Sequence, residues 1–250
     1  DGSGVEVQGA GLPPRNMGTG YTNTDWTFID DGDVIDTWRA YVVAKKKYKS
    51  AYDLGQLIDT RERRRIVGDF VMSPLDILND RTYPDTVVIS KSDFDSHGYT
   101  VHPAFLLKPP GRKDIFVNVP YRCLLPAGLD GILVTGLGVS AHRDAMPVIR
   151  MQADIQNQGY AVGIAGAMAA KEGCGLRDID IKALQKKLIK KGNLPERVLT
   201  DKESFPLPAE EIEHAVERVA NDYDGLERLL TQPMNAMPLL RQAYKTAETS

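Results

Sequence analysis

Three sets of residues could do chemistry by virtue of their types. The run Arg61–Arg65 is expected to be a solvated turn or strand edge. The alternative is a site for a carboxylate or phosphate, because guanidinium groups pair with such oxygens. His97, His102 and His142 could hold a metal ion, but no pair has the spacing of ligands on one helix and no acidic partner is evident. We therefore expect no metal site. Ser140 beside His142 could suggest a nucleophile and its base, but no third residue or strand-elbow turn accompanies them, so we discount nucleophilic catalysis.

Two glycine-rich segments could bind a phosphate group through backbone N–H groups. Gly9–Pro14 carries the first two glycines of the dinucleotide fingerprint, but its two prolines prevent a helix from opening at once. Gly136–Ala141 follows a short apolar segment, which is a better context, but Arg143, Asp144 and Pro147 delay the next helix. Taken alone, both segments are weak indications of nucleotide binding.

The composition is that of an ordinary folded protein of 250 residues. Hydrophobic residues make up 42% and charged residues 26%, and two cysteines exclude a disulfide framework. A net charge of -3 provides no positive field for nucleic acid, and the absence of an apolar stretch of about 18 residues argues against a membrane span. The chain shows no secretory leader and starts at Asp1 without methionine. We therefore expect a piece of a longer protein and assign no compartment.

The first half of the chain is expected to contain loops, one helix and short strands. The first 30 residues are rich in turn formers, and a helix is predicted over about Val34–Lys49. Apolar runs separated by turn-forming residues predict strands at Ile66–Met72, Thr86–Ser90 and Ile115–Val119.

The second half begins with a predicted strand and a long helix. Gly131–Gly136 is a short apolar segment that ends in glycine and predicts a strand. The alanine- and glycine-rich segment Gln152–Lys171 predicts a buried helix. Its Gly159, Gly163 and Gly166 would leave one face nearly flat, so that a sheet or a ligand could approach closely.

Polar helices are predicted for the remainder of the chain. A charged helix over Asp178–Lys191 should end at Gly192, with Pro195 just beyond. Two further helices, Glu210–Leu230 and Pro238–Thr246, indicate the start of a separate helical module.

Three blocks of sequence, in order and spacing, carry a resemblance to a known family. Arg61–Met72 is similar to R-E-S-R-R-I-x-G-D-Y-x-L, and Val119–Gly136 is similar to I-P-Y-R-C-L-x-P-x-x-x-x-N-L-L-V-A-G. Ser140–Gly163 is similar to S-x-x-H, R-V-M and G-Q-A-A-G in succession. Together they resemble the flavin-dependent oxidoreductases of the glutathione-reductase-like superfamily, in their FAD-dependent oxidoreductase domain. The resemblance covers about residues 50–192.

The resemblance implies how the chain would contact FAD. In such proteins the segment ending at Gly136 is the last strand of the FAD-binding sheet, and the following helix points its N-terminal end at the cofactor, where its dipole suits electron-rich groups. The implied cofactor contacts are Gly136, Leu137, Arg150, Met151, Gly159 and Gly163.

The resemblance also implies catalytic candidates near the flavin ring. His142 is the candidate base, because the pKa of histidine lies near neutrality. Arg150 is the candidate for stabilising negative charge on reduced flavin or on the substrate. Arg64, together with Arg65, is a weaker candidate for anchoring the substrate.

The sequence departs from the family pattern in two places. Gly136–Leu137 stands where the family usually has Gly-Arg, so the polar contact of that loop is not assigned. The βαβ unit that carries G-x-G-x-x-G and binds the ADP part of FAD is not recognised in the chain. We expect that unit in a missing N-terminal FAD-binding half.

These expectations define a fold class, which is α+β with α/β character. It would be a partial flavoprotein fold in three parts. Residues 1–125 would form part of a substrate domain with an N-terminal loop region, residues 126–195 the returning FAD-binding segment, and residues 205–250 a helical extension.

The predicted function is that of the C-terminal portion of a flavin-dependent oxidoreductase. It would transfer a hydride from a small-molecule or carbohydrate-like substrate to FAD, while the isolated chain would be inactive and free of FAD. One alternative is a non-catalytic binding or scaffold module that uses the C-terminal helices. A third possibility is an exported bacterial protein related to xanthan-type polysaccharide lyases, with Tyr99 and His102 as base and acid.

Overall fold

The computed structural model describes residues 65–94, 102–108 and 114–248, with six further residues between 34 and 46. The chain divides into two compact units, Asp1–Arg64 with Ser96–Tyr99, and Arg65–Asp95 with Thr100–Ser250. The elements described below belong to the second unit. The six residues of the first unit are helical, in agreement with the helix predicted there: Val34, Ile35, Trp38, Arg39, Val42 and Lys46. The predicted loops of the first 30 residues, including Gly9–Pro14, lie outside the described residues.

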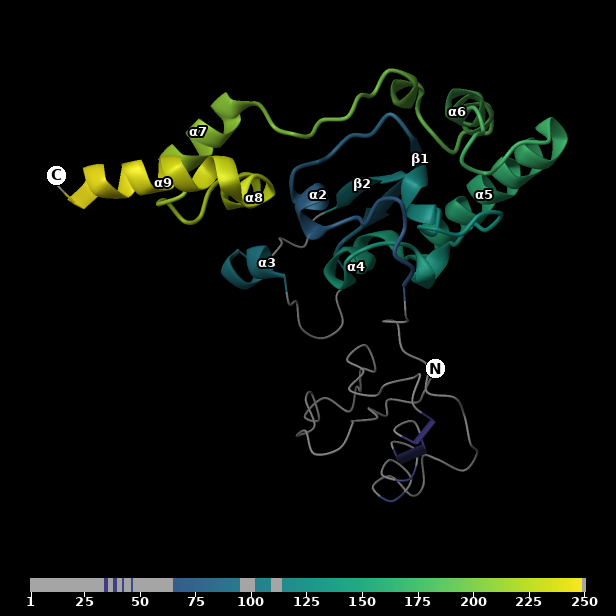
Figure 1. Cartoon of the computed structure of the whole chain (residues 1–250), viewed down its shortest axis with the longest axis horizontal. Helices are drawn as coiled ribbons and strands as arrows, with labels where there is room; N and C mark the ends of the chain where they lie inside the picture. The colour runs from purple at the N-terminus through teal and green to yellow at the C-terminus, as the bar shows by residue number, and fades with distance from the viewer. Residues whose placement is uncertain are drawn as a thin grey trace. The chain divides into compact units, whose positions relative to one another are not determined.

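Two antiparallel strands form the sheet of the second unit (Figure 1). β1 spans Thr86–Ser92 and β2 spans Ile115–Pro120, with Ser90 opposite Val117. Both strands were predicted from alternating or continuous apolar runs, and both are confirmed. A mixture of helices with an antiparallel sheet is an α+β architecture.

Helices surround this sheet. In the described residues they are α2 (Pro74–Leu78), α3 (Pro103–Leu107), α4 (Met146–Ile149), α5 (Gln152–Glu172), α6 (Ile181–Lys190), α7 (Ala209–Arg218), α8 (Leu226–Thr231) and α9 (Pro233–Glu248). Short 3-10 turns cover Tyr121–Leu124, Gly136–Gly138, Arg143–Ala145 and Glu196–Leu199. Helices α4, α5 and α6 pack on β1, whereas α8 contacts α2 and α3 (Figure 1). None of the helices in the described ranges is long and apolar enough to cross a membrane.

Two predicted strands are wrong. Residues 66–72 form only isolated bridges, Gly68 with Pro126 and Met72 with Ala141, because their partners are short segments that run in different directions. Residues 131–136 are irregular. Gly131 and Gly136 have φ of 74° and 71°, which an extended strand does not allow, and no described neighbouring strand offers this segment a ladder. Met72, Phe70 and Leu133 pack in or against the core, whereas Val67, Val71 and Ile132 are exposed.

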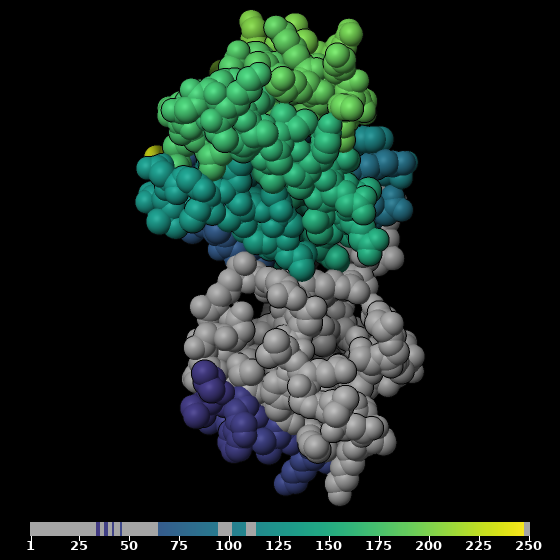
Figure 2. Space-filling view, turned by 90° about the vertical axis from the view of Figure 1, so that its right-hand side faces the viewer, coloured from purple at the N-terminus to yellow at the C-terminus, as the bar shows by residue number. Residues whose placement is uncertain are grey.

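Helix α5 was predicted correctly in its extent, but the side that it buries was not. The buried residues are spaced by three or four positions and include Gln158, Ala161 and Ala165. Gly159 and Gly163 lie on the exposed side, and a Cβ atom built on either would meet nothing within 4 Å. The close approach of the sheet at these glycines is therefore wrong, since alanine and glutamine side chains make that contact instead. Helices α5 and α6 face the viewer in Figure 2.

The remaining helices largely follow the prediction. Helix α6 begins after Asp180, whose side chain accepts a hydrogen bond from the N–H of Ala183, and the chain turns at Gly192 as expected. The single helix predicted over 210–230 is wrong: it is two helices, α7 and α8. The break occurs because Asp222 and Gly225 have positive φ. Helix α9 starts earlier than predicted and contains Pro238. Helices α7, α8 and α9 share a small apolar cluster of Ile212, Ala215, Leu229 and Ala236.

Candidate functional site

The turn at Gly136 is tied to α5 by one buried side chain. The N–H of Gly136 donates to Oε1 of Gln158 at 2.9 Å, and Nε2 of Gln158 donates to the carbonyl oxygen of Ile149 at 2.9 Å. Gln158 is fully buried. A single amide therefore satisfies two backbone groups that would otherwise be buried without partners, and it joins the Gly136 turn to the end of α4.

The start of α5 lies beside this turn. Met151 is the N-cap residue, and its side chain makes no capping hydrogen bond. In the first turn, the buried carboxylate of Asp154 accepts a hydrogen bond from the N–H of Met151. Burial raises the pKa of Asp154 above its ordinary value, against a hydrogen bond from the N–H of Lys91. The helix start thus combines backbone N–H groups with one buried carboxylate, that of Asp154, beside the Gly136 turn.

The predicted cofactor residues fall into two groups. Gly136 and Met151 both lie near Ile155. The position of a Cβ on Gly136 is 3.6 Å from Cγ2 of Ile155, and the N–H of Ile155 bonds the carbonyl oxygen of Met151. Leu137 packs against the core, and Arg150 is half-buried at the turn between α4 and α5, where it makes an interaction of its own. The second group is Gly159 and Gly163 on the exposed side of α5.

His142 lies at the start of the short turn Arg143–Ala145. Its Nδ1 accepts a hydrogen bond from the N–H of Asp144 at 3.1 Å, so the ring caps this turn. His102 does the same for α3, with Nδ1 accepting from the N–H of Ala104 at 3.2 Å. The two rings are in edge-to-face contact, with centroids 5.4 Å apart and an angle of 86° between their planes. We call His102 and His142 the histidine pair.

Both imidazoles of the histidine pair favour the neutral form. Burial lowers the pKa of His102, against the charge of Asp144. Burial also lowers the pKa of His142 against the charge of Asp144, and His102, Arg65 and Arg143 lower it further. A neutral ring whose Nδ1 accepts a hydrogen bond carries its proton on Nε2. Each ring therefore offers an Nε2–H donor.

Ser140 has a structural role. It is fully buried, and its Oγ accepts a hydrogen bond from the N–H of Gly68 at 2.9 Å. A Cβ on Gly68 would come within 2.8 Å of Cβ of Ser140 and 2.9 Å of the carbonyl oxygen of Leu125, which explains the glycine. This geometry agrees with the exclusion of a Ser140–His142 nucleophile. Arg64 lies outside the described residues, whereas Arg65 is described and half-buried.

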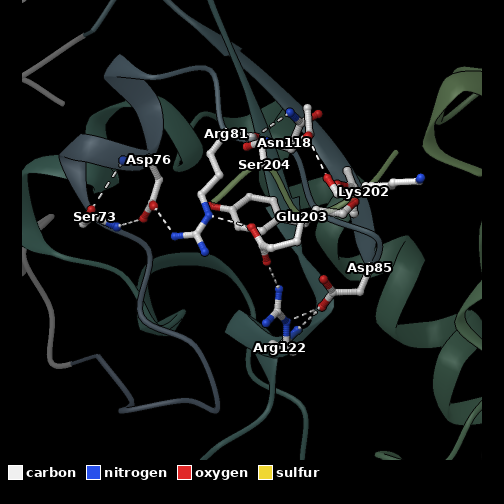
Figure 3. A network of polar contacts seen from close by, with 12 residues as sticks. Ser73, Asp76, Arg81, Asp85, Asn118, Arg122, Lys202, Glu203 and Ser204 are labelled. Atoms are coloured by element: carbon white, nitrogen blue, oxygen red, sulfur yellow. Dashed lines mark hydrogen bonds and ion pairs between the residues drawn. The ribbon is translucent and has the colours of Figure 1, made fainter. Parts of the chain in front are cut away.

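A second concentration of charge was missed by the sequence analysis (Figure 3). Arg81 bonds Asp76 at 2.8 Å and Glu203 at 2.9 Å, while Arg122 bonds Asp85 at 3.0 Å and Glu203 at 3.2 Å. We call these five residues the arginine cluster. Glu203 thus bridges two guanidinium groups that come from distant parts of the chain.

Aromatic rings pack against the arginine cluster. The guanidinium carbon of Arg81 lies 4.9 Å from the ring centroid of Phe70, 5.1 Å from that of Tyr83 and 4.3 Å from that of Phe205. Arg122 lies 5.2 Å from the Phe70 centroid. The cluster holds the segment around Glu203 against the sheet. Only Arg122 belongs to a sequence block that had been singled out, and nothing local indicated its partners.

The other expectations about sites have these outcomes. Within residues 65–94, 102–108 and 114–248, no three histidine, cysteine or acidic side chains are grouped so as to hold a metal ion. Tyr99, the base of the lyase alternative, lies outside the described residues, and so does His97. Cys123 and Cys174 are free thiols, and burial raises the pKa of Cys123.

Comparison with known proteins adds a family assignment. The sequence profile of the family described as FAD dependent oxidoreductase matches residues 22–188, about two thirds of the chain. No curated protein and no solved structure matches the chain.

Proposed function

The chain belongs to the FAD dependent oxidoreductase family, and we propose that it forms the part of a flavin enzyme where a substrate gives up a hydride. The observation that carries this proposal is the pairing of the Gly136 turn with the start of α5, inside the matched residues. Bound FAD would supply the hydride acceptor, which no amino-acid side chain provides.

The residues at this place fit the cofactor. The backbone N–H groups at the start of α5 suit an electron-rich acceptor such as the pyrimidine edge of a flavin or a phosphate. Gly136 adopts φ of 71°, which glycine adopts without strain, and this conformation shapes the turn that packs against the start of α5. We therefore assign Gly136, Leu137 and Met151 to cofactor contact.

The ADP part of FAD needs a separate unit in this proposal. The described sheet has two antiparallel strands, and the described residues contain no parallel βαβ unit of the kind that binds a dinucleotide. We propose that such a unit completes the cofactor site together with this chain.

His142 acts as a hydrogen-bond donor in this proposal. To serve as a base, the neutral ring would have to use the lone pair on Nδ1, which points at the N–H of Asp144. To donate from Nε2, it needs no rearrangement. We therefore propose that His142 donates a hydrogen bond from Nε2 to a substrate oxygen. Arg150 would stabilise the negative charge that develops on the substrate or the flavin. Arg64 remains a proposed anchor for the substrate.

The test uses the complete protein as its gene encodes it. We expect the purified protein to show a flavin absorption spectrum, or to acquire one when FAD is added. We expect substrate to bleach that spectrum without oxygen, and Arg150→Met to slow bleaching by a factor of roughly 10²–10³ with FAD content unchanged. A complete protein that neither contains nor takes up FAD would contradict the proposal.

A further inference from the structure

The two members of the histidine pair are linked through one buried residue. Asp144, which is 2% exposed, donates its N–H to Nδ1 of His142 and accepts the N–H of His102 on Oδ2 at 2.7 Å. Its other carboxylate oxygen pairs with Arg143 at 2.9 Å. The segment that carries His102 and the segment that carries His142 are therefore held at one spacing by a group that is itself fully engaged.

Within this linked pair, the Nε2 atoms of both rings can act only as hydrogen-bond donors. The Nδ1 atoms are occupied by the caps of α3 and of the turn Arg143–Ala145. No described residue accepts a hydrogen bond from either Nε2 atom, and neither atom is sealed inside the core without a partner. The pair thus offers two Nε2–H donors from rings in edge-to-face contact, and a metal ion cannot use them, because it would need the lone pair of Nε2.

Two adjacent donors match an acceptor with two oxygens. The ring centroids are 5.4 Å apart, and a carboxylate has one oxygen to offer to each Nε2–H group. The charges near His142 favour an anion. The positive charges of Arg65 and Arg143 lie close enough to lower the pKa of His142. The negative charge of Asp144 is already paired with Arg143 and with the backbone N–H of His102.

We propose that His102 and His142 together bind one carboxylate group of a ligand through their Nε2–H groups. The inference assigns His102 a binding role beside His142 and names the substrate class as an organic acid, such as a hydroxy acid or an acidic sugar. That the bound acid is then oxidised rests on the proposed function, whereas binding of its carboxylate requires no flavin.

The test is a nitrogen-15 and proton NMR titration of the imidazole groups, with the complete protein or, where it is too large, with this chain folded as shown by its amide spectrum. Acetate is the probe, and sodium chloride at equal ionic strength is the reference. The chain contains four histidines, and His214 is exposed on α7, so it serves as an internal control. We expect His102 and His142 to be Nε2–H tautomers and to shift together with acetate, while His214 does not follow them.

Two kinds of substitution separate capping from binding. Asparagine is a good N-cap residue, so His102→Asn and His142→Asn keep an acceptor for the capped N–H and remove the Nε2–H donor. We expect each to weaken acetate binding at least tenfold, as seen at the histidine that remains, with little change in thermal stability. His142→Ala removes cap and donor and should lower both.

An Nδ1–H tautomer at either ring, acetate shifts at only one ring, or shifts that persist in both asparagine variants would overturn the inference. Binding of inorganic phosphate without binding of acetate would also overturn it. FAD content of the complete protein is measured separately, so a flavoprotein without acetate binding refutes this inference alone, whereas acetate binding without FAD refutes only the proposed function.

Discussion

The arginine cluster and the histidine pair are two concentrations of polar groups with opposite design. In the arginine cluster each guanidinium group has carboxylate partners and an aromatic ring against its face. In the histidine pair Nδ1 of each ring is bonded within the protein, and Nε2 has no acceptor among the described residues, which is why we propose that it binds a ligand. A fully paired network stabilises the fold, whereas preorganised donors without partners are what a binding site requires. The comparison therefore separates structural charge from functional polarity in one compact unit.

The largest effect should come from opening the arginine cluster. Arg81→Met would leave Asp76 and Glu203 without their partner, and Asp76 is 5% exposed, so we expect a loss of about 2–3 kcal/mol in the free energy of unfolding. Arg218→Met is the matched control, because Arg218 and Asp224 are both about half exposed, and it should cost less than about 1 kcal/mol. Urea unfolding of both variants measures the difference. Equal losses would show that the cluster is no more structural than a surface pair.

Loss of the Gln158 amide should be nearly as costly. Gln158→Leu keeps the volume but leaves the N–H of Gly136 and the carbonyl oxygen of Ile149 buried without partners, so we expect a loss of about 2 kcal/mol. Amide exchange at Gly136 should accelerate. Gln152→Leu, on the exposed side of the same helix, should change stability by less than about 0.5 kcal/mol. Unchanged exchange at Gly136 in Gln158→Leu would mean that the amide does not hold the turn.

The sequence predicts those elements whose determinants lie close together along the chain. Strands β1 and β2 and helices α5 and α6 were predicted because their apolar spacing, and for α6 the capping residue Asp180, are local features of the sequence. The segment 131–136 was misjudged because a strand exists only with a partner, and glycine backbone angles are not visible in an apolar run.

The candidate site was foreseen only in part for the same reason. The Gly136 and Met151 positions came from the resemblance, but Gln158, which joins the two segments, carries no motif of its own. Arg81 and Glu203 are 122 positions apart, and the contact between His102 and His142 depends on the fold, so sequence spacing could indicate neither pairing.

Replacing each of two glycines by alanine should change the free energy of unfolding by a smaller amount, with opposite signs at the two positions. Gly163→Ala should raise the free energy of unfolding by about 0.5–1 kcal/mol, because the site is open and alanine favours a helix. Gly225→Ala should lower it by about 1–2 kcal/mol, because φ is 81° and the new Cβ would lie 2.9 Å from Cβ of Ala215. Thermal unfolding of both variants is sufficient. A destabilised Gly163→Ala variant would mean that the outer side of α5 is covered in solution.

The smallest effect should be a dependence of stability on pH through the histidine pair. The pKa of both rings is lowered in the folded protein, so the unfolded chain binds more protons. Their contribution to stability is therefore complete above pH about 6.5 and declines as the pH falls below it. Urea unfolding at a series of pH values should show this decline, and the double variant His102→Asn, His142→Asn should flatten it. An identical decline in the double variant would assign it to other groups.

The most direct test of the flavin assignment compares two glycines that have the same backbone strain. Gly136 and Gly128 have φ of 71° and 74°, so alanine at either position carries a similar conformational cost, and neither new Cβ would clash. Of the two, Gly136 packs against the first turns of α5, through Ile155 and Gln158, whereas a Cβ on Gly128 would meet nothing within 4 Å. The measurement is the FAD dissociation constant of the complete protein and of both alanine variants, by flavin fluorescence. We predict at least a tenfold weaker affinity for Gly136→Ala, about 1.4 kcal/mol, and an unchanged affinity for Gly128→Ala. Equal affinities of the two variants would contradict the assignment of the Gly136 turn and the start of α5 to the cofactor.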